Sequence, residues 1–167
     1  MSKLGKKVIP LPKDSKVAVQ GNLVTVTGPK GSEKVFFDEK IFSTQVNDKN
    51  EFLIAPLKKN KSSSVLWGTY RSLINNAILG VTKGHEKNLE LNGVGFKVAQ
   101  QGDELKLKLG FSHEAIYKVP KGLSIKIEKQ TKINISGTDK ALVSKVASEI
   151  KSLKPVEPYK GKGIKEK

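Results

Sequence analysis

Apolar and polar residues alternate along parts of the chain, and this alternation predicts β-strands with one face on the core and one face exposed to solvent. The clearest run is Leu105, Lys106, Leu107, Lys108, Leu109. The same two-residue period returns in Ile125, Ile127, Ile133 and Ile135. Since successive side chains of a strand point to opposite faces, these segments are predicted to be half-buried antiparallel strands.

Three- and four-residue spacing of apolar side chains predicts a first helix before residue 82. Its stripe is Leu66, Tyr70, Leu73, Ile74, Ala77, Ile78 and Val81. Ser62–Ser64 offer N-caps, and Gly80 is expected to end this helix. The lone tryptophan, Trp67, is expected in the core.

A second helix is predicted from an equivalent stripe near the end of the chain. Its members are Leu142, Val143, Val146, Ala147, Ile150 and Leu153. Gly137 or Thr138 is the expected cap, and Asp139 lies where the helix dipole favours a carboxylate. Pro155 is expected to stop the helix.

The two halves of the chain repeat each other at an offset of about 81 residues. "VAVQGNLVTVTG" at 17–28 matches "VAQQGDELKLKLG" at 98–110, and "STQVNDKNEFLIA" from Ser43 matches "SIKIEKQTKINIS" from Ser124. In both halves a glycine opens a two-residue hairpin turn, Gly21-Asn22 and Gly102-Asp103. The sequence therefore predicts two tandem duplicated α+β domains, 1–82 and 83–167, each an antiparallel β-sheet covered on one face by one helix.

The net charge of the chain narrows the class of partner that it is expected to bind. The 31 Lys+Arg and 16 Asp+Glu residues give a net charge of +15, which favours a polyanionic partner such as nucleic acid over a merely basic soluble surface. Arg71 is the single arginine, so attraction to phosphate is expected to outweigh bidentate base reading.

No cysteine is present, which excludes disulfides, thiolate zinc sites and cysteine nucleophiles. No apolar run reaches membrane-span length, and no secretory signal is recognised at the start.

No constellation of residues predicts catalysis. His85 and His113 stand 28 apart with no acid at metal-ligand spacing. The acidic pairs Asp38/Glu39 and Asp103/Glu104 lie among lysines, where solvated charges explain them better than acid–base chemistry. The glycine-rich "GPKG" and "GVGF" match no phosphate-loop pattern. The chain is predicted to be no enzyme and to need no cofactor and no metal.

Two loops of the second half are candidate RNA contacts. One contains Gly93, Gly95, Phe96 and Lys97, and the other contains Ser112 and His113 after Phe111. Backbone N–H, hydroxyl, imidazole and ammonium groups there suit phosphates and ribose hydroxyls. The alternative is a pair of tight turns that place Phe96 and Phe111 in the core.

The tail "VEPYKGKGIKEK" is the third candidate. Its predicted RNA contacts, with the lysine that precedes it, are Lys154, Tyr159, Lys160, Gly161, Lys162, Gly163 and Lys165. Proline and glycine argue against a helix, and neither a helix nor a buried strand is expected here. An extended strip lying in a crevice of folded RNA is the interpretation, and a frayed terminus is the alternative.

Several motifs resemble one known family, in its order. They are "KLGKKVIPLP", "VTVTGPKG", "GTYRSLINNAILGVTKG", "LELNGVGFKV", "LGFSH" and "EPYKGKGI". Together they are similar to the bacterial L-six family of large-subunit ribosomal proteins. The chain departs from the family pattern at Val156 and Glu114, where proline is usual or frequent, and in its final "KEK".

The resemblance implies a non-catalytic, cytoplasmic constituent of the large ribosomal subunit. It implies binding to large-subunit (23S) ribosomal RNA, mainly through the second domain and the tail at about 154–167. It also implies neighbouring large-subunit proteins near the stalk base, where translation factors dock, and neither a membrane nor a small-molecule substrate. A free RNA-binding regulator or RNA chaperone outside the ribosome is the alternative function.

Overall fold

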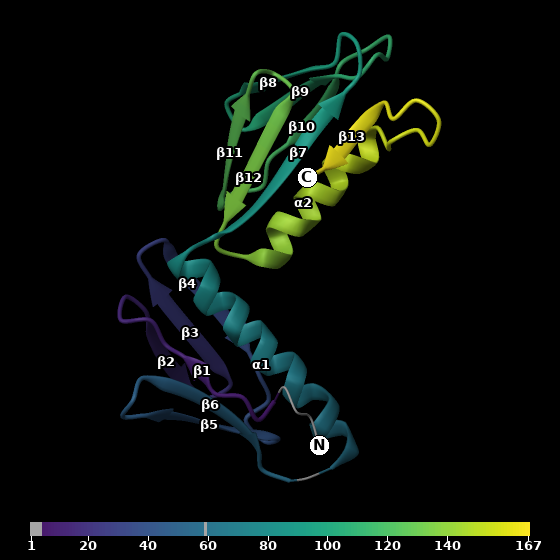
Figure 1. Cartoon of the computed structure of the whole chain (residues 1–167). Coiled ribbons are helices and arrows are strands. Elements are labelled where there is room, and N and C mark those ends of the chain that lie inside the picture. Colours follow the sequence, from purple (N-terminus) through teal and green to yellow (C-terminus); the bar gives the residue numbers. More distant parts are fainter. Residues whose placement is uncertain (1–4, 59) are drawn as a thin grey trace. The chain divides into compact units, whose positions relative to one another are not determined.

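The computed structural model describes residues 5–58 and 60–167 and divides into two compact units, Met1–Gly84 and His85–Lys167 (Figure 1). The division falls two residues after the boundary that the repeat predicts. Each unit has its own apolar core. Each is an α+β arrangement of antiparallel strands with one long helix, as the sequence predicts.

The described residues of the first unit form six strands and one helix. They are β1 (Ile9–Pro10), β2 (Lys16–Gln20), β3 (Leu23–Gly28), β4 (Gly31–Phe36), β5 (Phe42–Asn47), β6 (Glu51–Pro56) and α1 (Lys61–Thr82). The strands form two antiparallel sheets, in the orders β1-β6-β5 and β2-β3-β4. Helix α1 packs against β3, β4 and β6 (Figure 1).

Helix α1 begins and ends differently from the prediction. Asn60 is its N-cap, and the Asn60 backbone N–H donates to Ser63 Oγ at 3.0 Å. Gly80 is a buried residue inside the helix, not its end. Trp67 is buried as predicted, and its indole N–H donates to the Ile54 carbonyl at 2.7 Å.

The second unit repeats this plan. Its elements are β7 (His85–Asn92), β8 (Lys97–Gln101), β9 (Glu104–Lys108), β10 (Ala115–Lys118), β11 (Leu123–Glu128), β12 (Lys132–Gly137), α2 (Lys140–Leu153) and β13 (Gly163–Glu166). Its two sheets have the orders β10-β9-β8 and β11-β12-β7-β13. Helix α2 packs against β7, β12 and β13, and Asp139 itself is its cap, accepting from the Ala141 N–H at 2.8 Å.

The predicted strands and turns of the second unit are confirmed. Leu105, Leu107 and Leu109 are all buried, and the Gln101–Glu104 pair closes a hairpin at residues 102–103. In the first unit the Gln20–Leu23 pair closes the equivalent hairpin. Periodicity tells which side chains face the core but not which strands share hydrogen bonds, so one sheet per domain was predicted where two exist.

The prediction for the tail is wrong in one respect, because it does form a buried strand. Strand β13 pairs antiparallel with β7, and Ile164 lies opposite Leu91. Ile164 is fully buried in the core of the second unit. One isoleucine among lysines and glycines gives no visible period, so this strand could not be recognised from local pattern.

Candidate nucleic-acid interface

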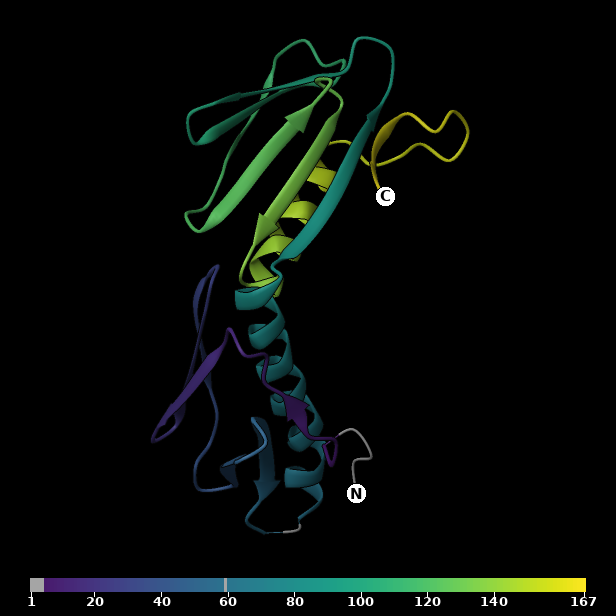
Figure 2. The same ribbon diagram turned by 60° about the vertical axis from the view of Figure 1, so that its left-hand side comes forward.

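The segment between α2 and β13 forms a closed loop, not an open strip or a frayed end. The Ile164 N–H donates to the Lys154 carbonyl at 2.9 Å, and the Glu157 N–H donates to the Lys162 carbonyl at 2.9 Å. A third bond runs from the Gly161 N–H to the Glu157 carbonyl at 3.0 Å. Figures 1 and 2 both show this loop standing away from the rest of its unit. We call residues 155–162 the tail loop.

Two glycines allow the tail loop to close. Gly161 has φ +65°, and a Cβ built there would meet nothing within 4 Å. Gly163 has φ +144°, and a Cβ there would lie 2.6 Å from the Pro155 carbonyl oxygen. Gly161 is therefore needed for its backbone conformation, whereas Gly163 is needed because the chain returns directly against Pro155 and Val156.

The tip of the tail loop presents an aromatic side chain between positive charges. Tyr159 is 98% exposed, and it is followed by exposed Lys160 and Lys162. Neither lysine makes an ion pair with another residue that the structure describes. A fully solvated tyrosine on an ordered loop offers a stacking face and a hydroxyl to a partner.

A hollow of about 630 Å³ lies beside the tail loop. It is lined by Asn92, Lys151, Val156, Gly161, Lys165 and Glu166. Glu166 forms an ion pair with Lys87 of β7, and the hydrogen bond from Lys87 holds the Glu166 pKa below its usual range. That carboxylate is already neutralised, so Lys151 and Lys165 leave the hollow net positive.

The structure brings two of the predicted segments together at a stacked cluster. The rings of Phe111 and His113 are stacked, with centroids 6.2 Å apart and an interplanar angle of 18°. The Lys154 ammonium lies 4.7 Å from the centroid of the Phe111 ring. Ser112 and His113 are exposed, and Phe111 is 43% exposed. The cluster thus joins the loop after β9 to the start of the tail.

Phe96 and Phe111 have opposite roles. Phe96 is buried, and Cβ atoms at Gly93 and Gly110 would lie 2.7 and 3.3 Å from its ring. The Phe96 ring is therefore core and offers no face for a base, contrary to its place among the predicted contacts. Phe111, which the predicted contacts left out, is the exposed aromatic of this region. Each phenylalanine directly follows a glycine, so the local sequence does not distinguish the buried ring from the exposed one.

Val94, Gly95 and Lys97 of the Gly93–Lys97 loop are exposed. Val94 is 95% exposed at its tip, and Gly95 has φ +77° with open space at its Cβ position. Lys97 is exposed at the first residue of β8. Gly93, in contrast, is constrained by the buried Phe96 ring that packs on it.

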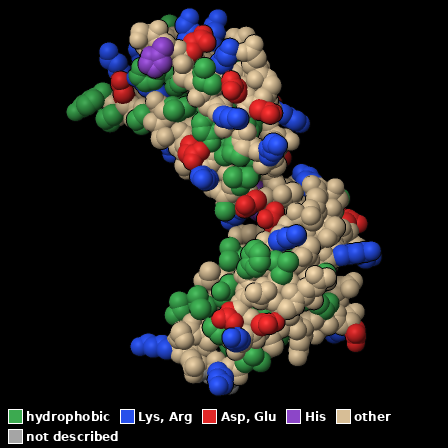
Figure 3. All heavy atoms as spheres, turned by 180° about the vertical axis from the view of Figure 1, so that it is seen from behind, with side chains coloured by type: hydrophobic (Ala, Val, Ile, Leu, Met, Phe, Trp, Pro, Cys, Tyr) green, Lys and Arg blue, Asp and Glu red, His purple; other side chains and the backbone are tan. Residues whose placement is uncertain are grey.

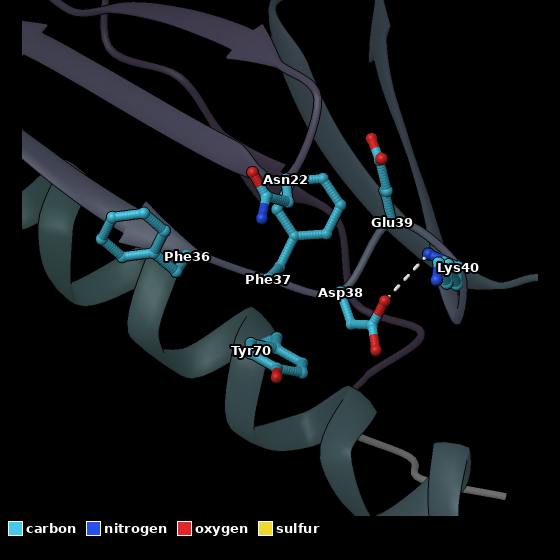
Figure 4. A pocket seen from close by; sticks show the side chains of 7 residues that line it. All are labelled: Asn22, Phe36, Phe37, Asp38, Glu39, Lys40 and Tyr70. Carbon is cyan, nitrogen blue, oxygen red and sulfur yellow. Dashed lines mark hydrogen bonds between the residues drawn. The ribbon is translucent and has the colours of Figure 1, made fainter.

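The structure does not support the acidic pair Asp38/Glu39 as a catalytic site. Among residues 5–58 and 60–167, no three His, Asp or Glu side chains are grouped to hold a metal ion. A hollow in the first unit is lined by Asn22, Phe36, Phe37, Asp38, Glu39, Lys40 and Tyr70. Figure 4 shows the carboxylates of Asp38 and Glu39 pointing in different directions, with Asp38 accepting from the Lys40 backbone N–H at 3.0 Å. They do not form the pair that general acid–base chemistry needs.

Charge alone does not delimit the interface. Figure 3 shows one face on which lysine and arginine side chains are scattered over both units with acidic side chains between them. Neither helix within the described residues has the length and apolarity to cross a membrane. Exposed aromatic side chains occur in both units, since Phe36 of the first unit is 69% exposed. The second unit differs in holding Tyr159, 98% exposed, on the closed tail loop.

Comparison with known proteins decides the family. The sequence model described as Ribosomal protein L6 matches residues 11–84 and 92–167, one stretch in each unit. The chain belongs to the ribosomal protein L6 family. The two stretches of the L6 match agree with the internal duplication, and membership identifies a ribosomal protein and not an enzyme, as predicted.

Full-length relatives agree with this assignment. The chain is 45% identical over 166 residues to the large ribosomal subunit protein uL6 of Anaeromyxobacter dehalogenans, covering 99% of this chain and 91% of that protein. It is 44% identical over 166 residues to the uL6 protein of Bartonella henselae, covering 99% and 92%. It is 43% identical over 165 residues to the uL6 protein of Nitratiruptor sp., covering 99% and 91%.

Proposed function

We propose that this chain is a structural constituent of the large ribosomal subunit that binds large-subunit ribosomal RNA mainly through its second unit. The L6 family and relatives named as large ribosomal subunit proteins support the assembly. The same relationship supports a cytoplasmic location, on the ribosome. The position near the stalk base and the translation-factor docking region is the one that the family resemblance implies.

One observation carries the RNA-binding part of the proposal, namely the ordered tail loop that holds Tyr159 almost fully in solvent. Exposed aromatic side chains on rigid supports are the usual stacking partners of unpaired bases. Lys160 and Lys162 beside it supply charge for the flanking phosphates. The loop therefore binds a base and its backbone together.

The stacked cluster extends this surface. Lys154 lies over the Phe111 ring, and His113 stacks on the same ring, so a cation and two flat groups lie together. Ser112 adds a hydroxyl, and the exposed Gly95 and Lys97 add backbone and charge from the neighbouring loop. With Gly161, Gly163 and Lys165 shaping the tail loop and its hollow, these residues make the proposed RNA-binding surface.

The test must remove contacts without removing structure. Truncation after Lys154 would delete β13 and expose the core around Ile164, so a loss of binding could come from unfolding. The better variant combines Tyr159→Ala, Lys160→Gln and Lys162→Gln in the full chain. The matched control is Lys13→Gln with Lys49→Gln, two exposed lysines of the first unit.

The measurements are affinity for large-subunit RNA at several salt concentrations and co-sedimentation with large subunits after a high-salt wash. The tail variant should weaken binding and make the slope of log K against log[salt] less negative by about 2, as two phosphate contacts predict. The control should change the slope by clearly less. Tail-variant binding equal to that of the unmodified chain would contradict the proposal. Tight RNA binding without co-sedimentation would instead favour a regulator outside the ribosome.

A further inference from the structure

The outer face of the β8–β9 hairpin carries lysines that face one another. Lys97 of β8 lies directly opposite Lys108 of β9, and Lys106 lies opposite Ala99 on the same face. Like charges directly opposite across an antiparallel pair destabilise a sheet. None of the three ammonium groups makes an ion pair with any residue of the described chain. The fold keeps these lysines although no ion pair among the described residues offsets their repulsion.

The equivalent hairpin of the first unit shows that the fold does not need lysine at positions 106 and 108. In the first unit β2 and β3 form the same hairpin with the same register, 81 residues earlier. There Lys16 lies opposite Thr27, and Ala18 lies opposite Thr25. Lys34 of β4 also lies opposite Thr25, so no two of these lysines are paired.

Threonine thus occupies the two β3 positions whose counterparts in β9 are Lys106 and Lys108. Threonine is favoured in strands, whereas lysine is mildly disfavoured. The burial pattern from Val24 to Thr27 is the same as that from Leu105 to Lys108, with apolar residues turned to the core between these positions. The difference between threonine and lysine at these positions therefore changes the outer surface and leaves the buried positions of the core as they are.

The lysines line a concave surface. A hollow of about 550 Å³ lies over this face and is lined by Lys97, Val98, Ala99, Gln100, Gln101, Lys106, Lys108, Glu114 and Gln130. Its three lysines outnumber its one acid, Glu114. Charge complementarity therefore calls for a polyanion, because several separate ammonium groups along one groove suit a chain of phosphates better than a single carboxylate.

One wall of the hollow has an uncommon backbone conformation. Lys129 and Gln130 have φ +52° and +57°, and neither is glycine. The Gln130 carbonyl accepts from the Val98 N–H at 2.9 Å, which fixes this turn beside β8. These are the backbone angles of the two central residues of a hairpin turn, which here joins β11 to β12 and is closed by the Thr131 N–H donating to the Glu128 carbonyl at 3.3 Å. The turn is therefore a fixed part of the hollow's wall.

We propose that the outer face of β8–β9, through Lys106 and Lys108, binds the phosphate backbone of a second RNA segment, apart from the one held by the tail loop. This inference rests on the proposed function, because it takes the partner to be the same large-subunit RNA. It adds that one unit clamps two stretches of RNA backbone at once. None of these lysines lines the hollow beside the tail loop.

The deciding variant is Lys106→Thr with Lys108→Thr in the full chain, which installs the residues of the equivalent hairpin of the first unit. The matched control is Lys126→Thr with Lys132→Thr, one exposed and one half-buried strand lysine of the β11–β12 pair, opposite Asn134 and Glu128. The probe is transcribed large-subunit ribosomal RNA. Its affinity is measured between about 0.05 and 0.3 M salt, a range over which the number of phosphate contacts determines how steeply the affinity falls.

The face variant should bind about tenfold more weakly near 0.15 M salt, with a slope of log K against log[salt] less negative by about 2. Its thermal unfolding midpoint should be equal to or above that of the unmodified chain, since a like-charge pair is removed. Lys106→Arg with Lys108→Arg keeps the charge and should keep the slope. Weaker binding together with undiminished stability is a combination that a purely structural role would not give.

The inference is overturned if the face variant changes the salt slope no more than the control does. It is also overturned if the threonine variant unfolds, because the fold would then need the lysines. Comparison with the tail variant separates the two proposals. If only the tail variant loses affinity, the tail proposal stands and the second segment does not exist. If only the face variant loses affinity, the β8–β9 face stands and the tail proposal fails.

Discussion

The two units share one strand plan but complete it differently. The order β1-β6-β5 of the first unit corresponds to β7-β12-β11 of the second. Strand β1 has two residues, whereas β7 has eight and carries β13 on its far side. Duplication therefore supplied the core, and the second unit differs by a longer strand and one more strand beside it. The proposed RNA-binding loop stands where that additional strand joins the helix.

The outer surfaces of the two units have also diverged. Threonines at the outer face of β3 correspond to lysines at the outer face of β9, on hairpins of equal register. The buried positions between them keep their apolar character, as Val24 and Val26 correspond to Leu105 and Leu107. The comparison teaches that packing constrains the inward residues while the outward residues are free to acquire a partner.

The largest expected effect separates the two units by their stability. Ile164→Ala removes a fully buried side chain from β13 and should destabilise the second unit by about 2–5 kcal/mol. The single tryptophan, Trp67, lies in the first unit and reports on that unit alone by fluorescence. Urea unfolding should show the circular-dichroism transition moving while the tryptophan transition stays in place.

Ile74→Ala is the matched control for this experiment, because Ile74 is fully buried in the first unit. It should move the tryptophan transition. If Ile164→Ala moved the tryptophan transition as far, the two units would not unfold as the separate bodies that the comparison assumes.

A smaller effect separates the two glycines of the tail. Gly163→Ala should cost about 3 kcal/mol or more, because the new Cβ would meet backbone at 2.6 Å that cannot move aside. Gly161→Ala should cost about 1 kcal/mol, because only its left-handed conformation opposes a side chain. Circular dichroism during urea unfolding gives both values, and equal costs would mean that the contact with Pro155 does not constrain the loop.

The smallest effect concerns the ion pair between β13 and β7. Glu166→Gln should lower stability at pH 7 by a few tenths of a kcal/mol, since both partners are partly exposed. Lys87 holds the folded Glu166 pKa below its unfolded value, so the contribution is present above about pH 4.3 and is lost as pH falls through the folded pKa.

Unfolding free energies of the two proteins measured from pH 7 to pH 3 test this assignment. The difference should be present at pH 7 and fall toward zero at the acidic end. A difference that persisted at pH 3 would mean that the glutamine acts through packing and not through the lost charge.

Much of this fold was predictable where local pattern and burial coincide. The alternating leucines of β9, the stripe of α2 and the two glycine turns all have the burial that their spacing predicts. The stripe of α1 was less reliable. Leu66 and Leu73 are exposed, because Trp67 and Ile74, one position further along the helix, face the core instead.

The remaining features depend on contacts far apart in sequence. Strand β13 exists because β7, more than 70 residues earlier, offers an unpaired side and a pocket for Ile164. Whether Phe96 or Phe111 is buried depends on which of the two rings, each next to a glycine, the core has room for. Neither fact can be read from a short stretch of sequence, and the choice of the tail and the two loops as RNA contacts stays a prediction.

The strand β13 has a consequence for binding that goes beyond the stability of its unit. An unanchored strip would lose backbone conformational entropy on meeting RNA, at about 1–2 kcal/mol for every residue immobilised. Residues 155–162 have already lost that freedom, because α2 holds one end and β13 holds the other. By holding the loop in place, β13 thus makes association more favourable, and loosening this strand should weaken binding even with every lysine in place.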